Sequence, residues 1–141
     1  MHKIIIAFVV LALVGPADKT LSQKATDRIK VKKTAPMKQV LIDRFVVPSG
    51  AVTEFLNRMK INRQFIRQLP GFVEDNAYRQ TGGDNEYNFV TVAVWESADA
   101  INNARQAVTA EYKREGFDMP GMIARLHIKM ERALYEKVAD E

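Results

Sequence analysis

One carboxylate of the sequence stands in surroundings that favour acid–base chemistry. Asp43 alternates with Leu41 and Phe45, so a strand here would place its carboxylate on an otherwise apolar face. A carboxylate in such surroundings can act as a general base that takes a proton from a phenol or an enol. The alternative role is structural, as a salt bridge with Arg44 or Arg125.

Two ring side chains are the other candidates for a catalytic role. Trp95 ends an apolar stretch on the same face as Phe89 and Ala93, where its ring could stack on a planar ligand or simply fill the core. His127 belongs to the residue type whose charge changes near neutral pH. A strand over residues 123–130 would place it on a charged face, and a solvated or interfacial histidine is the alternative.

Four further side chains are candidates for substrate binding: Phe45, Asn62, Tyr78 and Tyr112. Asn62 interrupts an apolar stripe and could hydrogen-bond a ligand or only satisfy a helix end, and both tyrosines could donate to a substrate oxygen or only pack in the core. We expect a cavity between the helices and one sheet face, with Asp43 as its main ionisable group. The side chains expected to line it are Leu41, Phe45, Phe55, Met59, Trp95 and Tyr112.

The spacing of apolar residues predicts the elements that position these side chains. We expect strands over 40–47, 72–80, 87–95 and 123–130, and helices over 52–69 and 98–115. Ser49 and Ser97 are suited to cap the helices, Gly116 to end the second one, and residues 119–121 to form a loop. The tail over 131–138 would extend the last strand or form an arm.

This β-α-β-β-α-β order predicts an α+β, ferredoxin-like fold, in which a four-stranded antiparallel sheet carries both helices on one face. The strands at 40–47 and 87–95 are apolar on both sides, so the open face of the sheet also needs a cover. A second copy of the chain would supply it, and the pairing of two sheets would give a homodimeric α/β barrel.

Two short stretches carry a family resemblance. The Leu-Pro-Gly-Phe step at 69–72, and the strand end Val-Ala-Val-Trp-Glu-Ser at 92–97, resemble the antibiotic biosynthesis monooxygenase family of the dimeric α/β-barrel superfamily. The resemblance covers about residues 40–135. It implies the barrel fold and one of several activities, among them cofactor-independent oxygenation of aromatic polyketides or quinols and haem degradation.

The haem-degrading branch of that family is disfavoured. The resemblance leads us to expect an Asn on the first strand and a Trp and a His in the second helix, but this sequence has Asp43, Ala104 and Arg114 there. Residues 101–116 contain no histidine, which removes the expected axial ligand of haem iron.

Two functional hypotheses follow. The first is a monooxygenase that needs no cofactor or metal and oxidises a small aromatic or quinol-type substrate with O2. The second is a non-catalytic barrel that binds an apolar small molecule. The absence of cysteine excludes thiol nucleophiles, disulfides and iron–sulfur clusters.

The N-terminus predicts export. A short positive start precedes eleven consecutive apolar residues at 4–14, and small residues follow, so residues 1–17 are typical of a signal peptide. Residues 18–39 form a basic linker, and the domain occupies residues 40–141. Residues 1–39 hold eight Lys and Arg against two Asp, whereas the domain is slightly acidic, so nucleic acid is not an expected partner. Membrane contact would occur only through the leader, and the destination would be periplasmic or secreted.

Overall fold

A computed structural model describes residues 36–140 of the 141-residue chain. The expected signal peptide and nearly all of the basic linker therefore lie outside the described residues. Among residues 36–140, no helix has both the length and the hydropathy that a membrane span requires.

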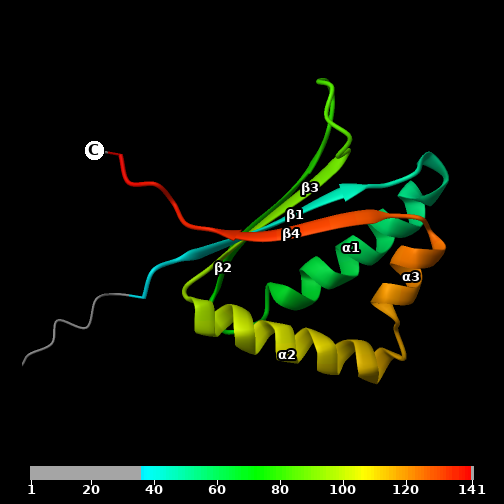
Figure 1. Cartoon of the computed structure of the whole chain (residues 1–141). Helices are drawn as coiled ribbons and strands as arrows, with labels where there is room; N and C mark the ends of the chain where they lie inside the picture. Colours follow the sequence, from blue (N-terminus) through cyan, green and yellow to red (C-terminus); the bar gives the residue numbers. More distant parts are fainter. Residues whose placement is uncertain (1–35, 141) are drawn as a thin grey trace, which may run out of the picture. The chain divides into compact units, whose positions relative to one another are not determined.

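The elements follow the expected ferredoxin-like order. The strands are β1 (Gln39–Val46), β2 (Phe72–Arg79), β3 (Phe89–Trp95) and β4 (Lys129–Tyr135). They form one antiparallel sheet in the order β2-β3-β1-β4. The helices are α1 (Val52–Ile66), α2 (Ala98–Glu115) and α3 (Met119–Arg125), with a single 3-10 turn, η2, at Ser49–Ala51. Figure 1 shows α1 and α2 together on one side of the sheet, which confirms the predicted α+β fold.

Local side-chain chemistry sets the ends of the helices. The Ser97 hydroxyl accepts a hydrogen bond from the backbone N–H of Ala100 at 3.1 Å, and Gly116 ends α2 in the left-handed conformation at φ +65°, as predicted. The cap predicted at Ser49 is wrong, because this residue lies inside the η2 turn and its side chain makes no capping bond. Helix α1 ends at Ile66, about one turn before the predicted end.

The last strand begins later than the sequence pattern predicted. The Asp118 carboxylate accepts a hydrogen bond from the backbone N–H of Gly121 at 3.0 Å, and Pro120 is accommodated in the first turn, so the expected loop at 119–121 opens helix α3. His127 adopts the left-handed conformation, at φ +52°, in the turn that joins α3 to β4. Alternating apolar residues in this segment had predicted a strand, but Met122 packs as a buried helical side chain.

The covered face of the sheet carries the core in two clusters. One contains Phe45, Phe55 and Phe89; the Phe55 ring packs edge-on to Phe45 and tilted against Phe89, at centroid distances of 4.9 and 5.3 Å. The other gathers around Trp95 and Ile101. The cavity described below lies along this covered face.

The opposite face of the sheet is apolar at its centre. Since strand side chains alternate between faces, the residues next to the core positions point to this side. They are only partly buried in the single chain, and they include Val40, Ile42, Val90, Val92 and Val94.

Candidate functional site

A cavity of about 370 Å³ lies between the covered face of the sheet and the three helices. All six side chains that we expected there line it, and Asp43 lines it as well. Its wall is mostly apolar. Three elements contribute methionines to the wall, namely Met59, Met119, Met122 and Met130. The flexible thioether side chains make an adaptable surface.

Asp43 is buried in this wall and is paired with Arg132. The antiparallel register sets Asp43 on β1 beside Arg132 on β4. The Arg132 Nε and Nη2 atoms donate to the two carboxylate oxygens, each at 2.7 Å. The hydrogen bond with Asp43 raises the pKa of Arg132 above its ordinary value.

The partners expected for Asp43 were therefore wrong. Arg44 points to the open face and donates to the hydroxyl of Tyr135. Arg125 pairs with Glu54. The sequence did not reveal Arg132 because the tail over 131–138 was expected either to extend the last strand or to form an arm, and its register against the first strand was not predicted; the structure extends β4 to Tyr135 and sets Arg132 opposite Asp43.

Three buried polar atoms at the cavity wall have no hydrogen-bond partner among residues 36–140. Two are Nε1 of Trp95 and Oδ1 of Asn62; the third is Nε of Arg58, whose guanidinium is bonded to Glu115 through Nη2. The Trp95 side chain is 3% exposed and stands edge-on to Phe72, with ring centroids 5.5 Å apart. Buried polar atoms in native proteins are nearly always paired, so an unpaired donor and acceptor at a cavity are consistent with a missing ligand.

Tyr112 lies where α2 approaches α1. Arg58 of α1 donates to Glu115 at 2.7 Å, and its guanidinium lies 5.0 Å from the centroid of the Tyr112 ring. Burial raises the pKa of Tyr112, so its hydroxyl stays protonated at neutral pH and can act as a hydrogen-bond donor.

A second buried carboxylate, Asp75 of β2, lines the cavity beneath α1. Burial by itself raises the pKa of Asp75, but hydrogen bonds from Arg67 and Arg63 outweigh it, and the net pKa lies below the ordinary value. Asp43 is therefore not the only acid in the wall. The sequence does not single out Asp75, because its contacts with Arg63 and Arg67 depend on how α1 packs on β2.

Two of the predicted site residues lie outside the cavity. His127 is exposed in the turn after α3, so neither the strand nor the catalytic position predicted for it is correct. Tyr78 is 56% exposed and pairs with Val90 on the open face. Residues 36–140 hold no cluster of three or more acidic or histidine side chains suited to a metal ion.

The fold, with its cavity between the helices and the sheet, defines the class of protein. The family model described as antibiotic biosynthesis monooxygenase matches residues 39–114. The chain belongs to this family. No curated protein sequence matches the chain.

Solved structures give the same fold. A variant of SnoaB, a cofactor-independent oxygenase from Streptomyces nogalater, is 25% identical at a TM-score of 0.52, covering 73% of this chain and 95% of its own. The haem degrader MhuD from Mycobacterium tuberculosis is 23% identical at a TM-score of 0.56, over 73% and 98% of the two chains. A conserved protein from Methanosarcina mazei is 15% identical at a TM-score of 0.58, over 74% and 96%. The last two likenesses concern the fold alone.

Proposed function

We propose that this protein is a cofactor-independent monooxygenase that oxidises a small planar phenol, anthrone or quinol-type substrate with O2. The observation that carries the proposal is the apolar cavity beside the Asp43–Arg132 pair. The similarity to SnoaB, which is described as a cofactor-independent oxygenase, supports it.

The proposed reaction begins with proton transfer. Each carboxylate oxygen of Asp43 accepts one bond from Arg132 and keeps a lone-pair position for a substrate proton. The Arg132 guanidinium stabilises the substrate anion that forms, because its charge is fixed next to the site. Trp95 forms a flat wall against which the ring can stack.

The electron balance of this reaction needs no other reductant. For an anthrone, the carbanion passes one electron to O2, and the two radicals join in a carbon–oxygen bond. The peroxide takes the proton held by Asp43, and loss of the second C–H proton then breaks the O–O bond. The substrate becomes a ketone, the other oxygen leaves as water, and all four electrons come from the substrate.

We also propose that a second copy of the chain covers the open face of the sheet. The partly buried apolar side chains at its centre, among them Ile42 and Val92, support this pairing, because exposed apolar patches of this kind usually mark an interface. The result would be the homodimeric barrel expected from the sequence.

Oxygen uptake with anthrone and with a naphthoquinol tests the function. Asp43→Asn should abolish catalysed uptake, since the amide keeps the shape but cannot accept the proton, and Trp95→Phe should weaken it. Asp84→Asn, in the exposed turn between β2 and β3, is the matched control. Substrate-dependent uptake that survives in Asp43→Asn would remove Asp43 as the base.

The alternative is a barrel that binds an apolar molecule without turnover. One observation favours it: each acidic side chain of the wall is ion-paired, so the described residues offer no unpaired base. Ligand binding without oxygen uptake by the native protein would support this second function.

A further inference from the structure

The charged side chains of the cavity wall are paired, with one exception. Arg58 pairs with Glu115, Arg63 with Asp75, and Arg132 with Asp43. Glu111 pairs with Arg114, which lies outside the wall. Among residues 36–140, Arg105 is the single lining cation that has neither an ion pair nor a side-chain hydrogen bond.

Helix α2 gives Arg105 no acid to pair with. Helical side chains meet at spacings of three and four residues. At those spacings Arg105 has only Ile101, Asn102, Val108 and Thr109 as neighbours. The Arg105 side chain is exposed to solvent. Its positive charge therefore has no acidic partner and is not buried. The opening of the cavity therefore carries an unbalanced positive charge.

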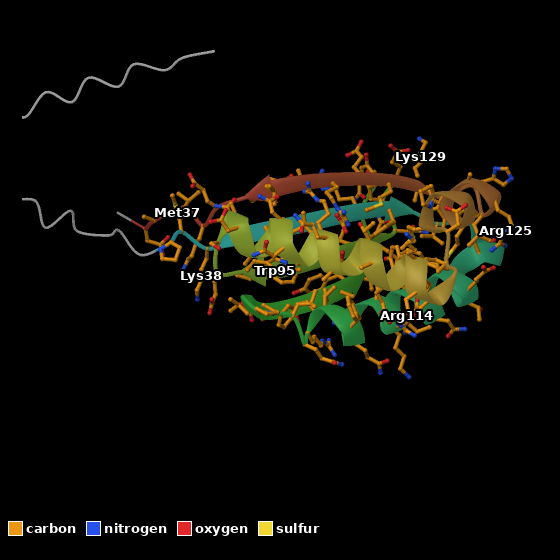
Figure 2. All side chains as sticks on the ribbon, turned by 90° about the horizontal axis from the view of Figure 1, so that it is seen from below. Met37, Lys38, Trp95, Arg114, Arg125 and Lys129 are labelled. Atoms are coloured by element: carbon orange, nitrogen blue, oxygen red, sulfur yellow. The ribbon has the colours of Figure 1, made fainter. Side chains whose placement is uncertain are left out.

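The direction of Arg105 follows from the helix geometry. Glu115 binds Arg58 of α1, so the side of α2 that carries Glu111 and Glu115 faces α1. Residues advance by about 100° each along a helix, which places Arg105 about 80° from Glu115 and about 120° from Glu111, on the other flank of the lining stripe. In the view of Figure 2, α2 runs between α1 and β4, so this flank faces β4.

The cavity opens on that side. Met130 and Arg132 are the lining residues of β4, and both are exposed in the single chain. Tyr112 lies close enough to Arg132 for each to shift the pKa of the other, which places this part of α2 beside β4. The Nη1 atom of Arg132 is not used in the pair with Asp43. Two guanidinium groups, Arg105 and Arg132, therefore flank the opening.

We infer that the substrate is a planar aromatic acid, whose carboxylate binds Arg105 and the remaining nitrogen of Arg132 at the α2–β4 opening while its ring enters the apolar interior. This rests on the proposed function, because it assigns a substrate class to the same cavity. A carboxylate matches the planar donors of guanidinium groups. Arg105 is then a residue that determines specificity and takes no part in the chemical step.

Binding of a matched ligand pair tests this inference. Anthraquinone-2-carboxylate and its methyl ester share a ring and differ in charge, and quenching of Trp95, the only tryptophan of the chain, reports their binding. We expect the acid to bind the native protein about tenfold more tightly than the ester, as for a hydrogen bond to a charged group. Added salt should reduce this preference. Arg105→Gln should reduce this preference several-fold without weakening binding of the ester, because Arg132 remains.

Lys113→Gln is the control, because it removes the same charge from an exposed position of α2 outside the cavity wall. It should leave the preference for the acid intact. Equal binding of acid and ester by the native protein, or an undiminished preference in Arg105→Gln, overturns the inference; ester binding and anthrone oxidation would then leave the proposed function standing. Failure of both ligands to bind overturns the inference and the proposed function together.

Discussion

The pair formed by Asp43 and Arg132 should respond unequally to the loss of each partner. Arg132→Gln leaves a carboxylate whose side chain is only 11% exposed without its counter-charge. Asp43→Asn leaves a guanidinium whose side chain is 49% exposed and which can turn toward water. A charge left in the interior costs far more free energy than a charge left at the surface, so the arginine variant should be the less stable one.

The exposures set the expected magnitudes. Breaking a fully buried pair costs about 3–5 kcal/mol, and the half-exposed arginine brings Arg132→Gln down to about 2–3 kcal/mol. Asp43→Asn retains one hydrogen bond, from the Arg132 guanidinium to the amide oxygen, and should cost about 1 kcal/mol. For a domain of this size, Tm should fall by about 10 °C or more in Arg132→Gln and by about 5 °C in Asp43→Asn.

Urea unfolding followed by Trp95 fluorescence, at one fixed protein concentration and neutral pH, measures both free energies of unfolding. Arg125→Gln is the matched control, because its pair with Glu54 is exposed on both sides and should contribute little to the free energy of unfolding. Equal losses for the two variants, or a larger loss for Asp43→Asn, would refute the reasoning from burial. The stable but inactive behaviour expected of Asp43→Asn would separate a catalytic carboxylate from a structural one.

Four further outcomes are expected. Because hydrogen bonds from Arg67 and Arg63 overcome burial and hold the pKa of Asp75 below its ordinary value of 3.8, this carboxylate stabilises the fold above that pH and loses its contribution as the pH falls through the folded-state pKa. Asp75→Asn should therefore cost about 1–2 kcal/mol at pH 7 and progressively less as the pH falls below 3.8, and a difference independent of pH would contradict the assignment. Sedimentation should give a dimer that Val94→Lys converts to a monomer, whereas a native monomer at all concentrations would argue against the barrel. Haem should produce no sharp Soret shift and no bilin product with a reductant; stoichiometric haem binding would show that another residue serves as the ligand. The protein recovered from its native cell envelope should begin near Asp18, and mass spectrometry that finds Met1 retained in a cytoplasmic pool would reject export.

The sequence alone determined the order of the four strands and the two long helices, and it identified several side chains of the cavity wall. Alternation on β1 put Leu41, Asp43 and Phe45 on one face, and the helical spacing of α2 put Tyr112 on its inward stripe. These are local properties, because the periods of strand and helix decide which side chains share a face. The capping of α2 by Ser97 and its end at Gly116 are local in the same way.

Only the tertiary structure decided which charges meet. Arg132 became the partner of Asp43 through the register of β4 against β1, and that register depends on where α3 ends. Residues 123–125 belong to α3, and not to the strand predicted there, because Asp118 caps a helix that begins at Met119 and buries Met122. Ion pairs across elements, and the absence of a pair for Arg105 in the described cavity wall, depend on contacts far apart in the chain. A periodic pattern holds no information about them, since the same local sequence is compatible with several registers.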